Sequence, residues 1–296
     1  MNLLIISSRF PYPLEKGDQL RLYYQIRELA KWHKITLVSV SDEKASERDK
    51  EQLKPFVYSQ YHFDITKGVR IYNRLSAIVT GLPIQVSQLY DPSIMRVIEK
   101  IAKRHHIGHV YCQLPRAAEY ARRLDIPKTI DYMDVFSRGM ERRAHKAPLY
   151  LKWLYLWEAS KQRNYERSLF GKFNNHTIIT KEDRAFVNHP KNLEIKIIKN
   201  GVDFAHFKPQ KTEIKYDIVF VGNMGYAPNI DAAEFLCKDL LPILQKEIPN
   251  IKILLAGTQP SKAVLKLQSN SVTVSGWMQD IRKAYASSTL FIAPMR

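Results

Sequence analysis

Short apolar runs alternate with helical stretches along most of the chain. Leu3–Ser7 and Ile35–Val40 are continuous runs of the kind that form strands buried on both faces of a sheet. Between them, Leu22, Ile26 and Leu29 recur at helical spacing. This alternation is typical of right-handed βαβ units with parallel strands, so we predict an α/β fold.

The same alternation continues to the end of the chain. Further short runs predict strands at Ile107–Cys112, Thr129–Asp131, Thr177–Thr180, Lys196–Lys199, Asp217–Val221, Lys252–Ala256, Val272–Val274 and Leu290–Ala293. Two strand-to-loop openings, at Ser7 and Gly222, each look like the start of a mononucleotide-binding half. We therefore predict two Rossmann-like domains rather than one wide sheet.

The polar stretch near residue 200 is the expected domain boundary. Asn200-Gly201, Pro209 and the polar residues 210–215 interrupt the periodicity there. A chain of 296 residues also has room for two domains of ~150 residues each. We expect a first domain at residues 1–199 and a second at residues 200–296.

The charge of the chain predicts an anionic partner. Lys and Arg number 46 against 29 Asp and Glu, a formal +17, which favours phosphates, nucleic acid or an anionic bilayer. The excess is concentrated, since residues 138–172 hold nine basic and three acidic residues, and residues 96–123 hold seven and two. No apolar run reaches the ~20 residues of a spanning helix, and no signal peptide is recognisable. Cys112 and Cys237 are too far apart for a disulfide framework or a thiolate zinc site, which fits a cytoplasmic setting.

Two loops after predicted strands are candidate phosphate sites. In the first, Gly17 and Asp18 open a helix, where a glycine permits close backbone approach and a helix N-terminus favours an anion. A plain surface connection with Asp18 as helix cap explains it equally well. In the second, Gly222 and Gly225 precede a helix that begins near Pro228, and a simple turn is again the alternative. Neither loop is a Gly-x-Gly-x-x-Gly fingerprint, so a tightly held nicotinamide cofactor is not expected at the first one.

Two carboxylates follow the predicted strand that ends at Asp131. Asp131 and Asp134 lie where open α/β sheets place their ligands, and could bind hydroxyls or act as a general base. Capping of the following helix is an equally good explanation. The cluster of His105, His106 and His109 lacks the spacing of metal ligands, so we expect no metal site.

An aromatic run with basic flanks marks residues 149–157. It contains Trp153 and Trp157 and is preceded by Arg142 and Arg143. An interfacial membrane helix has this composition, because aromatic rings sit at headgroup level and cations attract anionic lipid. A core helix with a basic, solvated end is the alternative.

The order of these motifs resembles the family 4 retaining glycosyltransferases of the GT-B type, and most closely bacterial sugar transferases of polysaccharide-export loci, including PEP-CTERM-associated ones. The matching pieces span the chain: Arg9-Phe-Pro-Tyr-Pro-Leu-Glu-Lys-Gly-Asp18 with Arg21, Asp131-Tyr-Met-Asp134 with Ser137, Asn200-Gly-Val-Asp203 with Phe207 and Pro209, Phe220-Val-Gly-Asn-Met224 with Pro228-Asn229, Gly276-Trp-Met-Gln-Asp280, and Ala293-Pro-Met-Arg296. The resemblance implies two Rossmann-like domains, with the acceptor held by the first and the nucleotide sugar by the second.

The resemblance also implies roles for particular residues. The acceptor side and its phosphate loop would include Gly17, Asp18, Arg21, Asp131 and Asp134, with the two carboxylates as candidate catalytic groups. The donor would be held by Gly222, Asn223, Met224, Trp277, Met278 and Arg296, with the tryptophan and Met278 beside the nucleobase. Family members often have an Arg where Asn223 stands, so Arg296 is a candidate for the missing cationic contact.

The implied chemistry is glycosyl transfer with retention from a UDP- or GDP-type nucleotide sugar, without a metal or another cofactor. The acceptor would be a saccharide or a lipid-linked saccharide at the cytoplasmic face of the cell membrane, with an anionic membrane surface as partner. The sequence stops at Arg296, before the two glutamates eight apart that hold the donor in the family. We therefore expect a truncated second domain and poor or absent transfer by this chain alone.

Two rival functions come from other classes of protein. A non-catalytic scaffold of a polysaccharide-assembly system is one alternative, because the donor-holding glutamates are absent. A nucleic-acid-binding protein is the other, because the net charge supplies phosphate affinity. No helix-turn-helix, zinc finger, RNP or OB-type pattern is present, so no specific nucleic acid is expected.

Overall fold

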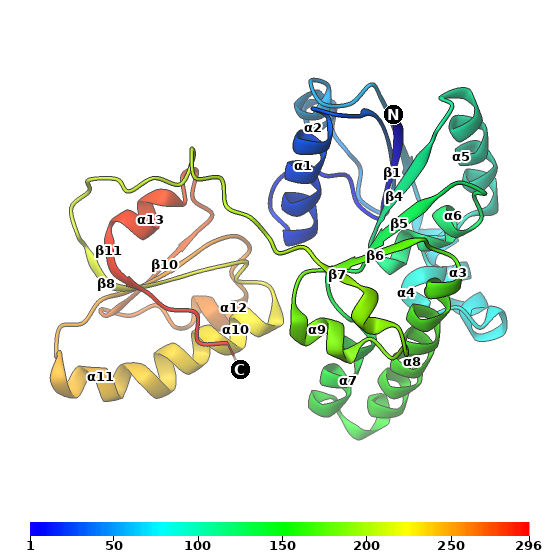
Figure 1. Cartoon of the computed structure of the whole chain (residues 1–296). Helices are drawn as coiled ribbons and strands as arrows, with labels where there is room; N and C mark the ends of the chain where they lie inside the picture. The colour runs from blue at the N-terminus through cyan, green and yellow to red at the C-terminus, as the bar shows by residue number, and fades with distance from the viewer. Residues whose placement is uncertain (296) are drawn as a thin grey trace. The chain divides into compact units, whose positions relative to one another are not determined.

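The chain forms two compact units, each with its own parallel sheet covered by helices (Figure 1). The structure is a computed structural model and describes residues 1–295. The first unit is Met1–Asn200 and the second begins at Gly201, one residue from the boundary expected from the sequence. The predicted α/β fold with two Rossmann-like sheets is confirmed.

The sheet of the first unit has seven parallel strands. They are β1 (Asn2–Ser7), β2 (Lys34–Ser41), β3 (Ser59–Asp64), β4 (His109–Gln113), β5 (Lys128–Asp131), β6 (Asn175–Ile178) and β7 (Lys196–Ile197). Their order is β3-β2-β1-β4-β5-β6-β7. The direction of winding reverses between β1 and β4, and open α/β sheets bind ligands at the carboxyl ends of the strands at such a point.

Helices cover both faces of this sheet. They are α1 (Gly17–Leu29), α2 (Glu47–Leu53), α3 (Lys67–Thr80), α4 (Ile84–Ser87), α5 (Pro92–Arg104), α6 (Ala118–Arg122), α7 (Phe136–Lys146), α8 (Leu149–Ser168) and α9 (Lys181–Phe186), with short 3₁₀ turns at Pro115–Ala117, Leu169–Gly171 and Asn192–Glu194. Alternate residues of β1 point to opposite faces, so Leu3 and Ile5 join the cluster of Leu22 on α1, while Leu4 joins that of Ile98 on α5. A strand buried on both faces therefore reads as a continuous apolar run.

The edge strand β3 has no counterpart among the predicted strands. Its sequence, Ser-Gln-Tyr-His-Phe-Asp, mixes polar and aromatic residues, and it is half-buried at the sheet edge. Tyr61 and Phe63 pack on the core, while the Nδ1 of His62 lies 2.8 Å from the Oγ of Ser39. The strand alternates between an apolar and a polar face, which a search for continuous apolar runs misses.

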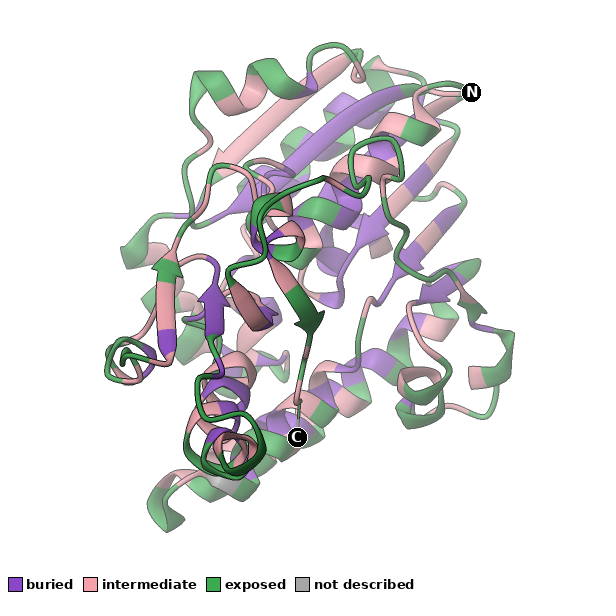
Figure 2. Ribbon diagram, turned by 90° about the vertical axis from the view of Figure 1, so that its left-hand side faces the viewer, coloured by how far each residue is buried: buried purple, intermediate pink, exposed green. Residues whose placement is uncertain are grey.

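The second unit has a four-stranded parallel sheet in the order β10-β9-β8-β11. Its elements are β8 (Tyr216–Val221), β9 (Ile253–Ala256), β10 (Val272–Gly276), β11 (Ser288–Phe291), α10 (Ala227–Glu234), a π-helical stretch (Phe235–Leu240), α11 (Leu241–Glu247), α12 (Lys262–Leu265) and α13 (Arg282–Ala286). Phe220 and Leu255 pack against Leu236 on one face, and Leu254 packs against Ala284 on the other. Figure 2 shows buried residues gathered in the strands of both units. Here the winding reverses between β8 and β11.

Candidate functional site

The loop after β1 carries a set of ion pairs at the carboxyl edge of the first sheet. Helix α1 begins at Gly17, and Lys16 at its N-cap makes no side-chain capping bond. Asp18 lies inside the first helical turn, where its carboxylate pairs with Arg9 and lies 3.8 Å from the Nη2 of Arg116. The Nε2 of Gln113, at the end of β4, donates to the backbone oxygen of Asp18 at 2.8 Å. The alternative of Asp18 as helix cap is therefore wrong, because its side chain instead joins the two loops at the winding reversal.

Gly17 has no steric reason within the chain to be glycine. A Cβ added there meets no other atom within 4 Å, and its φ lies outside the left-handed region that favours glycine. Helix α1 opens at this residue, so backbone N–H groups of its first turn are free for an acceptor from outside the helix. The expected role of Gly17 beside a ligand stays a prediction.

A buried ion pair closes the same edge. Asp131, at the end of β5, is fully buried and accepts from the Nε of Arg21 at 2.7 Å and the hydroxyl of Tyr111 at 2.9 Å. The Nη1 of Arg21 donates to the Oδ1 of Asn200 at 2.8 Å. Burial raises the pKa of Tyr111 well above its ordinary value, and the charge of the neighbouring Asp131 raises it further. The structure thus brings Asp131 and Arg21 together as an ion pair that is buried away from solvent.

The two expected catalytic carboxylates face opposite ways. Met133, with φ of 62°, turns the chain between them, so that Asp131 points inward and Asp134 is exposed. No solvent reaches the side chain of Asp131 in this structure, and its expected catalytic role stays a prediction. Val135 is the N-cap of α7 without a side-chain bond, so neither carboxylate caps that helix. Asp131 is a positioning residue, and Asp134 remains the candidate that a substrate can reach.

The surroundings of Asp134 adjust its affinity for protons. Many protein atoms surround its carboxylate although solvent still reaches it, and this desolvation raises its pKa to about 6. Asp183 raises the pKa further, whereas Arg116 and Arg142 lower it. A carboxylate with a pKa near neutrality can accept or return a proton under physiological conditions.

A second buried carboxyl lies beside the start of α7. Glu166 of α8 accepts from the backbone N of Ser137 at 3.1 Å and from its Oγ at 2.7 Å. Burial raises the pKa of Glu166 to about 7, although the bonds from Ser137 act in the opposite direction. The sequence contained no signal for this pair, because the two residues are far apart in the chain.

Three glycines lie in the loops that follow β8 and β9. Gly257 has φ of 139°, and a Cβ on it would lie 1.7 Å from the backbone oxygen of Gly222. A Cβ on Gly222 would lie 2.7 Å from the Nδ2 of Asn229, and one on Gly225 would lie 2.8 Å from the backbone oxygen of Gln259. Close packing of the loops after β8 and β9 therefore requires Gly225 and Gly257, whether or not a ligand binds, whereas a Cβ at Gly222 would displace the side chain of Asn229.

Side chains hold the backbone of this loop in place. The Oδ1 of Asn223 accepts from the N of Gly225 at 2.9 Å, and the Nδ2 of Asn229 donates to the backbone oxygen of Asn223 at 2.9 Å. Met224 lies in the core and its N donates to the backbone oxygen of Thr258. The side chain of Met224 is therefore not available to a donor, and the expected place of this residue in the donor site stays a prediction. For Gly222 and Asn223 the role beside a diphosphate stays a prediction.

The turn after β10 places an aromatic side chain in solvent. Trp277 is 64% exposed and follows Gly276, whose φ of 66° ends the strand. Met278 is half-buried and packs against Val219 and Ala284. The carboxyl end of β10 lies at the same sheet edge as the loops after β8 and β9. Arg296, the expected cationic contact, lies outside the described residues.

The predicted membrane contacts lie on α7 and α8. Arg142, Arg143 and Trp153 are exposed, whereas Trp157 is half-buried with the Nζ of Lys161 over its ring at 4.2 Å. Within residues 1–295, no helix combines the length and apolar character needed to cross a bilayer. The same part of the chain contains no cluster of three or more side chains suited to holding a metal.

Helix α3 adds an exposed apolar surface that the sequence analysis missed. Its exposed side chains are Ile71, Tyr72, Leu75, Ile78 and Val79. The signal was present, since several of these residues recur three or four positions apart, as on one face of a helix. The helix meets α8 at its carboxyl end, where Lys161 donates to the backbone oxygen of Ala77 at 2.9 Å.

Comparison with known proteins gives a family match for the second unit and a relative of the whole chain. Residues 215–296, nearly all of the second unit, match the family described as glycosyl transferases group 1. The whole chain is similar to a 44.6 kDa protein in the cps region of Klebsiella pneumoniae, uncharacterised, with 22% identity over 99% of this chain and 76% of that protein.

Solved structures share the fold. Sucrose-phosphate synthase from Thermosynechococcus elongatus superimposes with a TM-score of 0.65 at 9% identity, over 100% of this chain and 76% of that one. TarM of S. aureus, in complex with fondaparinux, alpha-GlcNAc-glycerol and UDP, superimposes with a TM-score of 0.65 at 9% identity, over 98% of this chain and 80% of that one. UDP-GlcNAc 2-epimerase from Methanocaldococcus jannaschii superimposes with a TM-score of 0.53 at 14% identity, over 98% of this chain and 78% of that one. The architecture is GT-B, and the matched domain together with this fold supports a glycosyltransferase.

The buried ion pair gives a stability prediction. Asp131→Ala leaves the guanidinium of Arg21 buried without its charge partner, so we expect it to lower the free energy of unfolding by ~3–5 kcal/mol. Asp134→Ala removes an exposed carboxylate and should change it by less than ~1 kcal/mol. Urea unfolding of both variants at neutral pH measures the difference, and equal losses would contradict the assignment of Asp131 as the positioning residue.

Glu166 gives a pH prediction. Its pKa is about 7 in the folded protein against an ordinary 4.5, so the folded state binds its proton more tightly. The free energy of unfolding therefore falls as pH rises from ~4.5 through ~7, by at most ~3 kcal/mol. In Glu166→Gln this contribution is absent, so the stability of the variant relative to the parent should increase between about pH 5 and pH 8. A difference that stays constant with pH would show that Glu166 does not titrate in this range.

Proposed function

We propose that the chain is a retaining glycosyltransferase that moves a sugar from a UDP- or GDP-type nucleotide sugar to a saccharide or lipid-linked acceptor. The match of residues 215–296 to the glycosyl transferases group 1 carries the proposal. The fold alone supports less, because a 2-epimerase of UDP-GlcNAc shares it. The motif order quoted above supports family 4 and the polysaccharide-export type associated with PEP-CTERM systems.

The donor is assigned to the second unit and the acceptor to the first. Support for a nucleotide donor comes from the glycine-lined edge at β8 and β9, with exposed Trp277 at the end of β10. The TarM structure contains UDP, which supports a nucleotide of this type. The similar protein of the Klebsiella cps region supports a polysaccharide acceptor.

In this proposal the bond between the anomeric carbon and the diphosphate breaks, and its electron pair stays on the diphosphate. The oxygen of the acceptor hydroxyl forms the new bond on the same face of the sugar, and its proton passes to the leaving diphosphate. Backbone N–H groups, helix termini and cationic side chains stabilise the leaving charge, so the reaction needs no metal and no cofactor besides the donor. Asp134, exposed and with a pKa of about 6, orients the acceptor hydroxyl.

The first unit carries the proposed membrane contact at the cytoplasmic face. Exposed apolar residues of α3 and exposed Trp153 of α8 supply apolar area, and Arg142 and Arg143 supply positive charge. Contiguous exposed apolar residues on a helix are unusual for a surface that faces only water. An anionic bilayer complements both features.

Nucleotide binding to the second unit is the first test. Thermal unfolding with millimolar UDP, GDP or ADP should show stabilisation by at least one of them. Trp277→Ala should weaken that nucleotide about tenfold, because a base stacked on an aromatic ring gains ~1–3 kcal/mol. Trp32→Ala, a tryptophan that is 79% exposed in the first unit, is the matched control and should leave the shift unchanged. Absence of stabilisation by every nucleotide would favour the scaffold alternative.

Membrane binding is tested with vesicles. The double variant Leu75→Gln, Ile78→Gln should reduce cosedimentation with phosphatidylglycerol vesicles at least tenfold, since burying one such side chain contributes ~1.5–3 kcal/mol. Its fold should be intact because both side chains are exposed. Ile243→Gln, which removes an equally exposed residue of α11, is the control. Equal vesicle binding by the parent and the double variant would exclude α3 as the contact.

A further inference from the structure

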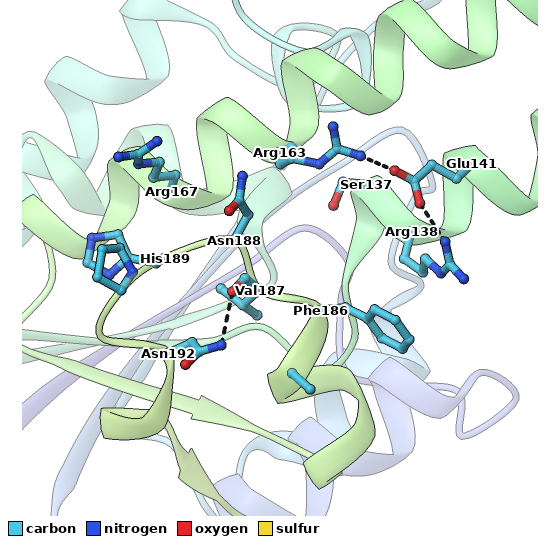
Figure 3. A pocket seen from close by; sticks show the side chains of 12 residues that line it. Ser137, Arg138, Glu141, Arg163, Arg167, Phe186, Val187, Asn188, His189 and Asn192 are labelled. Carbon is cyan, nitrogen blue, oxygen red and sulfur yellow. Dashed lines mark hydrogen bonds and ion pairs between the residues drawn. The ribbon is translucent and has the colours of Figure 1, made fainter.

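A separate pocket lies within the first unit, between α7, α8 and the segment that follows α9. It has a volume of about 600 Å³ and is lined by Ser137, Arg138, Glu141, Arg163, Arg167, Ala185, Phe186, Val187, Asn188, His189, Pro190 and Asn192 (Figure 3). Pockets of ~300–1,000 Å³ commonly hold small molecules. Its lining residues lie outside the 215–296 region of the family match and outside the loops described above.

The pocket has an excess of positive charge. It contains three arginines and one carboxylate, Glu141. Arg138 donates from its Nη1 to Glu141 at 2.8 Å, and Arg163 forms an ion pair with the other oxygen of the same carboxylate through its Nη2. Arg167 forms no ion pair or side-chain hydrogen bond with any residue in 1–295. One negative charge thus faces three positive ones.

Arg167 and Asn188 supply the unpaired donors of the pocket. Arg163 and Arg167 lie one turn apart on α8, and residues at this spacing share a helix face. Figure 3 shows Asn188 pointing toward α8 from the opposite side of the pocket. The Asn188 side chain is exposed and has no hydrogen bond to the described residues. An anion between Arg167 and Asn188 would receive one guanidinium fork and an amide, while the ion-paired Arg163 adds positive charge one turn away.

The pKa of His189 depends on the positive charge of the pocket. Its ring stacks on Phe170 with the centroids 3.7 Å apart. Its pKa lies below the ordinary value because of burial first, then the positive charges of Arg167 and Lys191, while Glu194 acts in the opposite direction. An anion beside Arg167 would offset that positive charge and raise the pKa of His189.

We propose that this pocket binds a phosphate monoester or a diphosphate, as a second anion site distinct from the donor site. Guanidinium groups bind phosphate oxygens bidentately, and a dianion matches the net charge of the lining. A nucleic-acid backbone requires a continuous basic groove, whereas this is a local recess lined by α7, α8 and residues 185–192. The phosphate can belong to a soluble sugar phosphate or to a lipid headgroup.

Calorimetry on the full chain tests the proposal with inorganic phosphate, diphosphate and glucose 1-phosphate. A parallel arm uses vesicles with phosphatidic acid, whose headgroup is a phosphate monoester, against vesicles with phosphatidylglycerol. Saturable binding of a soluble phosphate supports a free phosphorylated ligand. A preference for phosphatidic acid that disappears in Arg167→Gln supports a headgroup. The absence of both would overturn the proposal.

The variants are matched for charge. Arg167→Gln should weaken phosphate binding about tenfold or more, because hydrogen bonds to charged groups are the strong ones. Arg163→Gln should weaken it less, because its guanidinium is already paired with Glu141. Arg48→Gln on α2 makes the same charge change away from the pocket and should leave binding intact. An equal loss in Arg48→Gln would show that net charge alone attracts phosphate, and would overturn the site. Thermal unfolding should be unchanged in Arg167→Gln, because that side chain is exposed.

Two further readouts separate this site from the donor site. The imidazole signals of His189, followed by NMR titration, should show a raised pKa when diphosphate is added to the parent protein but not to Arg167→Gln. Stabilisation by a nucleotide should be lost in Trp277→Ala and retained in Arg167→Gln if the two sites are separate. The reverse pattern would place nucleotide binding in this pocket and contradict the proposed donor site rather than the anion site.

Discussion

The buried pair of Asp131 and Arg21 determines the form of the ligand edge of the first unit. It joins the end of β5 to α1, and Tyr111 of β4 and Asn200 are bonded to the same two residues. A charge without solvent is costly unless it is paired, so each partner requires the other. The position of α1, and with it the loop that begins at Ser7, depends on this contact. Removing either side chain would leave the other as a buried, unpaired charge beside the helix that carries Gly17 and Asp18.

The two units differ in the groups that form the carboxyl edges of their sheets. The first uses charged side chains, because Arg9, Asp18 and Arg116 bridge the loops at the winding reversal. The second uses close backbone packing, in which Gly225 and Gly257 leave no space for a Cβ beside the neighbouring backbone. An edge of backbone groups suits a diphosphate, whose oxygens accept N–H bonds. An edge of charged and hydroxyl-binding side chains suits a more varied acceptor. This difference agrees with the assignment of donor and acceptor that we propose.

Periodicity predicted the fold well, because strands such as β1 and β9 are buried on both faces and appear as plain apolar runs. It missed β3, which lies at an edge and alternates. The position of Asp131 and Asp134 after β5 was also predictable, since the carboxyl ends of strands face ligands. Their opposite orientation was not, because it depends on the left-handed backbone of Met133, a conformation that the residue type does not indicate. The burial of Met224 was not predictable either, since its neighbours in sequence are loop residues and its contacts are with the core.

Charge in this chain is informative only after pairing is taken into account. The net +17 predicts an anionic partner but no location. In the structure much of it is neutralised locally, as for Arg9, Arg138 and Arg282, which each lie beside a carboxylate. The arginines left without such a partner are the ones that an external anion can use, because binding there requires no internal ion pair to break. Arg167 is one of these, and it lies in a pocket with Asn188 rather than on an open helix face. The same reasoning explains why the sequence, which contained every one of these residues, could not identify the site. The pocket draws on α7, α8 and residues 185–192, and only the fold brings these segments together.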